Sequence, residues 1–401
     1  MRDELVSRGL PYHDDAHGYF GDGCFPHTRN NVYGHRVSAA TGYLDGVTRT
    51  RPNLTIFEHA HVESLIIKNS TAIGARIRHE NRTEMIHGNE VIVCAGTLHS
   101  PALLMRAGVG PGTELQALGI PVVRDAPGVG ENLQDHPMCG IGLYLNPQAR
   151  VSPTLRNSNL LTSRWSSGTA GCATQDMKLS VTNRFGIPNI GAHFGTVQYG
   201  PFKSYSRGKV ALRSSDTYAE PFVSFNLLSD ARDLSRMMDA TRFAYDVLTS
   251  PTVHGMVDVM FAGVFGELMR KLHVRSQFSD LFTKVGAKVL DRGGRLRTLA
   301  LNFAMDRRFD IHELIHDERK MEEWIQFGVQ GDWHACGTCA MGAKDNPLAV
   351  VDPRACVYGV KNLRVADASI MPSIPTANTA LTTLMIGEKV ADLIIRDTGD
   401  R

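Results

Sequence analysis

The chain has 401 residues, of which 42% are hydrophobic and 21% are charged, and its formal net charge is +2. So small a net charge gives no electrostatic case for binding nucleic acid or an anionic membrane. No apolar run reaches the roughly 18 residues of a membrane-spanning helix, so we expect no integral membrane segment.

The N-terminal residues and the cysteines bear on the compartment. MRDELVSRGLPYHDDAHGYF (residues 1–20) carries acidic side chains and lacks the apolar core of a signal peptide. The seven cysteines form an odd and dispersed set, at positions 24, 94, 139, 172, 336, 339 and 356. Without an export signal, such a set favours reduced thiols over a disulfide framework. We therefore expect a cytoplasmic protein, long enough for two domains.

A strand followed directly by a helix is predicted at residues 90–110. EVIVCAG (90–96) is a short apolar run rich in β-branched residues, which predicts a buried strand and a tight turn. In the following segment, Ser100 is the expected N-cap, Pro101 suits the first helical turn, and Gly108 can close the helix. Such a junction presents backbone N–H groups to a phosphate or a flavin edge, although α/β proteins contain many of them.

The next segments continue this alternation. IPVVRDAPGVGENLQDHP (120–137) looks like a strand followed by a glycine-rich loop. SRGKVALRSSD (206–216) and AEPFVSFNLL (219–228) look like strands, with Pro221 at a strand edge. Residues 230–250 predict a helix that covers a sheet, with four apolar side chains within reach of one face: Leu234, Met237, Met238 and Phe243.

DWHACGTCAMG (332–342) contains Cys336 and Cys339 at C-x-x-C spacing, with His334 just upstream. A structural zinc site usually needs four ligands, most often as two paired motifs, and no second C-x-x-C pair occurs in the sequence. A redox dithiol should open a helix, whereas three nearby glycines predict a loop here. We therefore expect neither a metal nor dithiol chemistry, and a lone histidine such as His334 needs support from elsewhere in the chain.

The C-terminal segment repeats the order of strand and helix. NLRVADASIMP (362–372) predicts a buried strand with Asp367 at its carboxyl end. TANTALTTLMIGEKVADLII (376–395) predicts a helix, because Ile386, Val390 and Leu393 follow helical spacing. At the start of this helix, Asn378 can cap the helix or can project into a ligand site at the strand–helix junction.

These stretches resemble the glucose–methanol–choline (GMC) family of oxidoreductases, which use FAD to oxidise alcohols. The segments that carry the resemblance are GTLHSPALLMRAGVGP (96–111), PGVGENLQDHP (127–137), SRGKVALRSSD (206–216), WHACGTCAMG (333–342) and VYGVKNLRVADASIMPSIPTANTALTTLMIGEKVADLI (357–394). A looser fit extends over RVSAATGYL (36–44) and RPNLTIFEHAHVESLII (51–67), and Ala107 stands where the family usually has serine.

One departure from the family concerns the cofactor. The family opens with a strand–G-x-G-x-x-G–helix unit that holds the FAD pyrophosphate, and this sequence contains no G-x-G-x-x-G. We therefore expect the chain to begin after that unit. It would then be a fragment, a truncated reading frame or one of two chains, and a separate N-terminal FAD-binding chain or segment would be its partner.

The resemblance implies that His334 is the catalytic base and that Asn378 orients the hydroxyl group of a small-molecule alcohol. A neutral imidazole can accept the hydroxyl proton while hydride moves from carbon to flavin N5. A second hydrogen-bonding side chain fixes the hydroxyl oxygen so that the C–H bond points at the flavin. The cysteines then merely occupy loop positions, and His136 is expected to be structural.

Contacts to FAD are carried over from the family position by position. The resemblance implies that Val62 faces the adenine, that Asp367 and Ala368 lie near the pyrophosphate and ribityl groups, and that the positions close to the isoalloxazine or its linker are Ala95, Trp333 and Thr379. Asn378 also lies on the cofactor side. Val62 and Ala95 can equally be core residues, and covalent attachment of FAD is left open.

The expected fold is α/β, with a Rossmann-like FAD-binding domain that lacks its first βαβ unit and a substrate domain on a mainly antiparallel sheet. The expected boundaries are 1–137 for the FAD-binding domain, 138–340 for the substrate domain, which holds the strands of 206–228, and 341–401 for the returning segment. Two other functions stay open: a non-catalytic remnant that binds no flavin, and a lyase of the cyanohydrin-cleaving type on the same scaffold.

Overall fold

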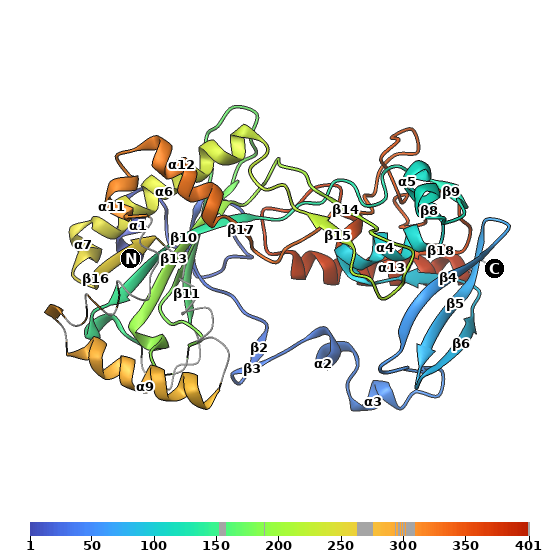
Figure 1. Ribbon diagram of the computed structural model, residues 1–401, viewed down its shortest axis with the longest axis horizontal. Helices are drawn as coiled ribbons and strands as arrows, with labels where there is room; N and C mark the ends of the chain where they lie inside the picture. Colours follow the sequence, from blue (N-terminus) through green and yellow to red (C-terminus); the bar gives the residue numbers. More distant parts are fainter. Residues whose placement is uncertain are drawn as a thin grey trace. The chain divides into compact units, whose positions relative to one another are not determined.

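The computed structural model describes residues 1–151, 158–187, 189–262, 276–292, 294–295, 297, 299, 301 and 309–399. The chain divides into two compact units, and each is described by itself below (Figure 1). Unit 1 comprises Met1–Gly34, Pro137–Lys203 and Asp230–Gln330. Unit 2 comprises His35–His136, Ser204–Ser229 and Gly331–Arg401.

Unit 1 is built on an antiparallel sheet, as expected. Its strands lie in the order β1 (Gly23–Pro26), β11 (Asn159–Trp165), β12 (Met177–Thr182), β13 (Phe194–Pro201), β10 (Pro137–Leu145) and β16 (Val257–Ala262), and β17 (Gln330–Gly331) pairs with β10. Eight of the nine residues of β10 are buried. A strand covered on both faces needs such a continuous apolar run, here PMCGIGLYL.

Helices cover both faces of this sheet (Figure 1). On one face lie α6 (Ala231–Thr249) and α12 (Glu318–Gly328), and on the other lies α9 (Gln277–Asp291), whose Leu290 carbonyl accepts a hydrogen bond from Tyr144 Oη. The remaining described helices of unit 1 are short: α1 (Arg2–Ser7), α7 (Pro251–His254), α11 (Ile311–Leu314), η1 (Pro147–Ala149) and η2 (Gly191–His193).

The α6 helix confirms the prediction for residues 230–250, with Asp230 as its N-cap. Its buried face differs in part from the expected one, because Met237 is buried whereas Leu234, Met238 and Phe243 are each only half-buried. The face instead includes Arg236, whose guanidinium contacts the carboxylates of Asp176 and Asp233, and all three side chains are fully buried. An ion pair inside the core is not visible in an apolar pattern.

Unit 2 contains several small sheets. The largest is antiparallel, β4 (His61–Lys68), β5 (Thr71–His79) and β6 (Arg82–His87), and β7 (Val91–Val93) pairs in parallel with β18 (Leu363–Val365). Two further pairs are β8 (Val109–Gly110) with β9 (Arg124–Asp125), and β14 (Lys209–Ala211) with β15 (Phe222–Ser224). A short pair, β2 (Asn31–Val32) with β3 (His35–Arg36), lies where the chain first passes between the units.

The helices of unit 2 are α2 (Ala39–Tyr43), α3 (Gly46–Arg49), α4 (Gly96–Arg106), α5 (Gly112–Ala117), η3 (Ala368–Ile370) and α13 (Thr379–Gly399). The hydrophobic core lies around β7, α4 and β18 and includes Ile386 and Val390 of α13, whereas Leu393, the third residue of the expected helical spacing, is half-buried. Gly108 follows α4 with φ +83°, a left-handed conformation that favours glycine, and so it closes the helix as expected.

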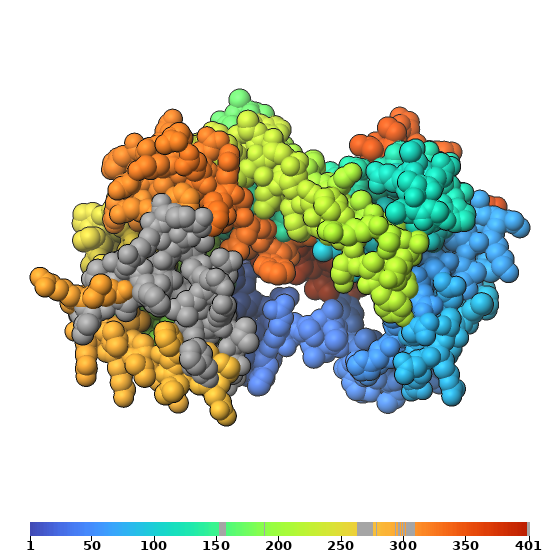
Figure 2. All heavy atoms as spheres, in the orientation of Figure 1, coloured from blue at the N-terminus to red at the C-terminus, as the bar shows by residue number. Residues whose placement is uncertain are grey.

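Three expectations about the fold need correction. Ser100 is not the N-cap of α4, because the helix already begins at Gly96 and Ser100 lies inside it. The predicted strands of 206–228 pair with each other in unit 2 and do not join the sheet of unit 1. In Figure 2 this yellow-green segment lies against residues of unit 2, where the Val210 amide donates to the Gly130 carbonyl.

The third correction concerns the expected domain boundaries of 137, 138–340 and 341. The first 34 residues belong with the antiparallel sheet because β1 pairs with β11. Residues 331–340 belong with unit 2 because Cys336 and Cys339 lie in its core. Among the helices that the structure describes, none combines the length and the hydropathy that crossing a membrane would require.

Candidate functional site

Two parallel strands bring Ala95 and Asp367 together. Because β7 and β18 run in parallel, the segments that follow them leave the same edge of the sheet. The carboxylate of Asp367 accepts hydrogen bonds from Gly96 N at 2.9 Å, from Ser100 Oγ at 2.5 Å and from Ser369 N at 2.8 Å. Asp367 therefore holds the first turn of α4 and the turn of η3, next to Ala368.

A cavity of about 830 Å³ lies beside this turn and is lined by both Val62 and Ala95. Its wall is formed by β4, β7, α4 and residues 217–220. Val62 is 38% exposed, so it is not the core residue that the alternative interpretation requires. The volume lies in the range of small-molecule and cofactor sites, which is roughly 300–1,000 Å³. The two positions expected at opposite ends of a cofactor thus border one cavity.

The segment NLQDH (132–136) ties together two loops that are distant in sequence. The Asn132 amide group donates to the carbonyls of Gly337 and Pro372, each at 3.2 Å. Gln134 exchanges backbone hydrogen bonds with Cys336, and its Oε1 accepts from Ile374 N at 3.0 Å. One loop carries His334 and the other leads to Asn378, so this segment fixes both of them from one side.

Asp135 holds the backbone of both histidines. Its Oδ1 accepts from His136 N at 2.7 Å and from His334 N at 2.9 Å, and the residue is 3% exposed. Burial raises the pKa of Asp135 from its ordinary 3.8 to about 6, against the backbone amides of His334, His136 and Asp332, which favour the carboxylate. The nearby carboxylate of Asp332 raises this pKa further.

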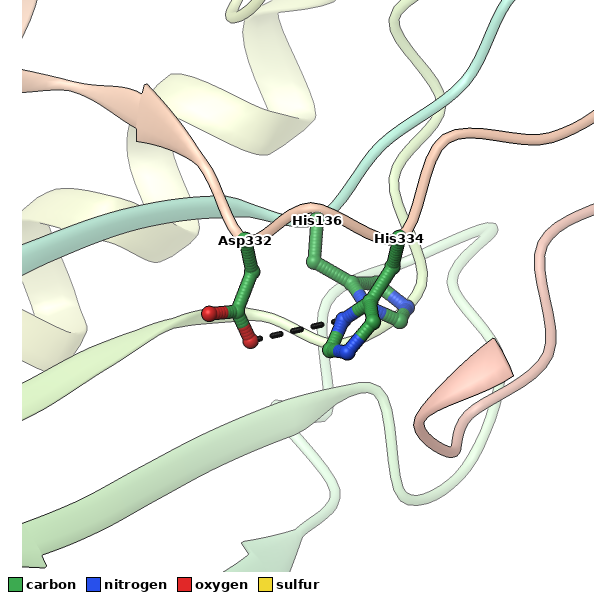
Figure 3. Close-up of side chains that lie close together, drawn as sticks. All are labelled: His136, Asp332 and His334. Carbon is green, nitrogen blue, oxygen red and sulfur yellow. Dashed lines mark hydrogen bonds and ion pairs between the residues drawn. The ribbon is translucent and has the colours of Figure 1, made fainter. Parts of the chain in front are cut away.

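His334 lies against His136 and Asp332 (Figure 3). The two Nδ1 atoms are 3.0 Å apart, and Oδ2 of Asp332 is 3.4 Å from Nδ1 of His334. His136 is fully buried, whereas the side chain of His334 is 13% exposed. Figure 3 shows Asp332 and His334 extending from the segment after β17, and His136 from the segment before β10.

These three side chains could geometrically offer ligands to a metal ion, since one ligand atom from each lies within 4.8 Å of the others. However, two nitrogens bound to one zinc ion in tetrahedral geometry lie about 3.4 Å apart, given bonds of about 2.1 Å. The observed 3.0 Å is the length of a hydrogen bond. The arrangement therefore fits a hydrogen-bonded histidine pair better.

Trp333, between Asp332 and His334, has φ +62° and is 94% exposed. A left-handed conformation is costly for a bulky residue, on the order of 1–3 kcal/mol, and such strain tends to occur at functional sites. Exposure of a whole indole likewise costs hydrophobic free energy. Both observations suit a residue that lies at a binding site, and the position of Trp333 close to the isoalloxazine or its linker stays a prediction.

Asn378 and Thr379 begin the C-terminal helix. Asn378 is exposed and directly precedes α13, whereas Thr379, its first residue, is 7% exposed. The carbonyl of Pro375, three residues before Asn378, accepts from Nε2 of His136 at 3.1 Å. His136 therefore contacts His334 on one side and the Asn378 loop on the other.

The two cysteines of the C-x-x-C sequence lie in a hydrophobic core. Cys336 and Cys339 are fully buried in the core of unit 2, and burial raises the pKa of the Cys339 thiol. All seven cysteines have free thiols rather than disulfides. This location agrees with the interpretation that the cysteines are packing residues in a loop.

Sequence reasoning did not anticipate the contacts of Asp135, His136 and Asp332. His136 lies 198 residues from His334 and 239 residues from Pro375, so no local pattern records these contacts. The available signal was the clustering of hydrogen-bonding residues in NLQDH, directly before a strand of apolar residues.

Comparison with known proteins identifies relatives along nearly the whole chain. It is 35% identical over 396 residues to 5-(hydroxymethyl)furfural oxidase of Methylovorus sp. (strain MP688), and 32% identical over 421 residues to an oxygen-dependent choline dehydrogenase of Cronobacter sakazakii. These alignments cover 98% and 97% of this chain and 66% of each relative, so the chain spans about two thirds of the length of these curated relatives.

Solved structures agree on the fold. Pyridoxine 4-oxidase from Mesorbium loti superposes with a TM-score of 0.77 at 23% identity, covering 97% of this chain and 68% of that chain. A formate oxidase superposes with a TM-score of 0.79 at 21% identity, covering 100% and 70%. Identities this low establish the fold alone.

Family models match both parts of the sequence that carry the site. The N-terminal GMC oxidoreductase model matches residues 5–138, and the C-terminal model matches residues 204–387. We expected the family's N-terminal region to be lacking and a separate N-terminal chain to be the partner. The match to residues 5–138 supports neither expectation. The resemblance inferred from the sequence is confirmed: the chain belongs to the GMC oxidoreductase family.

Proposed function

We propose that this protein oxidises a primary or secondary alcohol to a carbonyl compound with FAD as the hydride acceptor. The observation that carries the proposal is the position of His334 in a GMC oxidoreductase. It is a slightly exposed imidazole, held by Asp135 and His136, beside the loop that leads to Asn378. The relatives named for oxidising 5-(hydroxymethyl)furfural and choline support an alcohol as the substrate.

The residues present fit FAD at two places in unit 2. The cavity beside Asp367 is lined by Val62 and Ala95, and its size suits a nucleotide. Trp333 offers an uncovered indole face next to His334, where an isoalloxazine ring would pack. When bound, FAD supplies a two-electron hydride acceptor.

The side chains of the site would act on the hydroxyl group. His334 accepts the hydroxyl proton and, as an imidazolium beside the carboxylate of Asp332, stabilises the negative charge that develops on oxygen. Asn378 donates a hydrogen bond to the same oxygen and so fixes the direction of the C–H bond. The alcohol thereby loses one proton and one hydride, which leaves the carbonyl product.

Binding of FAD is testable without turnover. Trp324 is buried and Trp165 is half-buried, so Trp333 is the exposed fluorophore of the three tryptophans. Titration of the full chain with FAD should quench the fluorescence of Trp333. In the Trp333→Phe variant, most of this FAD-dependent decrease in tryptophan fluorescence should be absent. An unchanged spectrum at FAD concentrations up to about 100 μM would count against the cofactor.

Activity is tested with the FAD-loaded chain and a redox dye under anaerobic conditions. The panel contains 5-(hydroxymethyl)furfural, choline and pyridoxine, with a cyanohydrin to detect a lyase. We expect dye reduction by at least one alcohol and formation of the matching carbonyl product. Release of cyanide without dye reduction would support the lyase, and FAD binding with no turnover of any compound would support a non-catalytic protein.

A further inference from the structure

His136 lies between the two loops that carry the proposed catalytic residues, and both of its ring nitrogens have a close polar neighbour. Nε2 is 3.1 Å from the carbonyl oxygen of Pro375, and Nδ1 is 3.0 Å from Nδ1 of His334. The ring is fully buried, so its orientation is set by these contacts and by packing.

The contact with Pro375 determines which nitrogen of His136 carries the hydrogen. A carbonyl oxygen can only accept a hydrogen bond, so Nε2 of His136 must be the donor. Burying a second proton, and with it a positive charge, in a fully buried ring would cost free energy. In the neutral ring with hydrogen on Nε2, Nδ1 is a lone-pair acceptor.

This assignment fixes the tautomer of His334. Nδ1 of His334 faces the accepting Nδ1 of His136 at 3.0 Å and the carboxylate of Asp332 at 3.4 Å. Both neighbours are acceptors, so Nδ1 of His334 must carry the hydrogen. A neutral imidazole carries only one, and Nε2 of His334 is then the basic nitrogen.

We propose that His136 is a positioning residue that holds neutral His334 in the Nδ1–H tautomer and so makes Nε2 the atom that accepts the substrate proton. The proposal rests on the proposed function for its chemical consequence, but the tautomer itself is a property of the protein alone. During oxidation the O–H bond of the alcohol breaks and its proton forms a new N–H bond at Nε2. The electron pair of the C–H bond leaves with the hydride for FAD.

A metal ion held by the same three residues would require the opposite tautomer. If Nδ1 of His334 were a ligand, its hydrogen would have to sit on Nε2, because a metal binds the nitrogen lone pair. The hydrogen on His334 therefore distinguishes a positioning role for His136 from a metal site.

The direct test is nuclear magnetic resonance of the full chain labelled with ¹⁵N-histidine, at a pH where the histidines are neutral. Long-range ¹H–¹⁵N correlations distinguish the two tautomers of each ring, and spectra of His334→Ala and His136→Asn assign the two residues. We expect His334 with hydrogen on Nδ1 and His136 with hydrogen on Nε2. Hydrogen on Nε2 of His334 in the wild-type chain would overturn the proposal whether or not the protein turns over an alcohol.

Two substitutions of His136 separate positioning from packing. His136→Phe keeps a ring of similar size but removes the closer of the two acceptors at Nδ1 of His334, so the Nε2–H tautomer of His334 should gain population. His136→Asn places an amide oxygen close to the position of Nδ1 and should preserve the Nδ1–H form. In a serine protease, a wrong histidine tautomer lowers kcat by about 10⁴-fold. We expect a fall of about 10- to 10³-fold for the Phe variant, with KM nearly unchanged, and rescue to within about fivefold by Asn.

Each outcome has one meaning. Loss of the Nδ1–H signal in the Phe variant with unchanged kcat would overturn the positioning role and leave the proposed function standing. Equal losses in both variants with an unchanged tautomer would assign His136 to packing and overturn the proposal. If wild-type protein oxidises no alcohol, the proposed function fails, and the tautomer in wild-type and His136→Asn protein still decides the structural claim.

Discussion

Asp135 joins the two histidines of the site through their backbone amides, and its carboxyl group titrates outside its ordinary range. Its pKa is raised to about 6 in the folded protein, against an ordinary value of 3.8. As the pH rises, the unfolded chain therefore releases this proton first, which favours the unfolded state. The contribution of this group to the free energy of unfolding is complete below pH 4 and is lost as the pH rises through about 6. At 1.36 kcal/mol for each pKa unit, the loss is about 3 kcal/mol.

Asp135→Asn should remove this dependence, because the amide oxygen can still accept both backbone hydrogen bonds and carries no charge. The free energy of unfolding, measured by denaturant titration from pH 4.5 to 7.5, should fall with pH less in this variant than in wild type. Asp135→Ala, which leaves two buried N–H groups without this acceptor, should lose about 2–5 kcal/mol at every pH. Parallel pH profiles for the Asp135→Asn variant and wild type would contradict the assignment of the titrating group.

Cys336 and Cys339 give a second prediction at this scale. Both are packed in the core of unit 2, so their joint replacement by Ala should cost about 1–3 kcal/mol of stability through lost packing. Alcohol oxidation should stay within about tenfold of wild type, a change of roughly 1.4 kcal/mol in the activation free energy. Stoichiometric zinc in wild-type protein, lost from the double variant, would show that the cysteines are ligands.

Elements were predicted well where burial alone decides them, and less well where a polar contact does. The β7, β18 and α6 segments lie where apolar patterns placed them. The start of α4 was misplaced because the hydroxyl of Ser100, which was expected to cap the helix, donates a hydrogen bond to Asp367 instead. The two residues are 267 positions apart in the sequence, so no local pattern records this contact. The strands β14 and β15 were assigned to the wrong sheet because alternation predicts a strand but not its partner.

The α6 helix offers a matched pair of arginines that test the buried ion cluster. Arg236 contacts Asp176 and Asp233 with no exposure, whereas Arg242 contacts Asp239 and Glu318 with its side chain 35% exposed. Arg236→Met should lower the unfolding free energy by about 3–5 kcal/mol, because two buried carboxylates lose the positive charge of this guanidinium. Arg242→Met should cost less than about 1 kcal/mol.

Trp165 and Trp324 report on unit 1, so the unfolding of the two arginine variants is best followed by tryptophan fluorescence in a Trp333→Phe background. Trp165 contacts Phe243 of α6, with ring centroids 5.1 Å apart. Similar losses for the two variants would mean that the Arg236 cluster is no more stabilising than a surface ion pair.

For the molecule as a whole, the family and the antiparallel sheet follow from the sequence, whereas the division into units does not. Each unit is assembled from three separate stretches of chain, and apolar patterns carry no information about which stretches meet. The same limit applies to the site. The resemblance predicted His334 and Asn378, and the NLQDH segment that connects their loops became visible only in three dimensions.

The claim that His334 takes the hydroxyl proton is tested most directly by anaerobic stopped-flow measurement of flavin reduction, with the best alcohol of the panel as the reductant. His334→Ala should slow flavin reduction by roughly 10²- to 10⁴-fold, the usual effect of losing a general base. Asn378→Ala should cost less, because it removes one orienting hydrogen bond and leaves the base in place. A His334→Ala variant that binds FAD and is reduced within threefold of the wild-type rate would remove His334 from the chemistry.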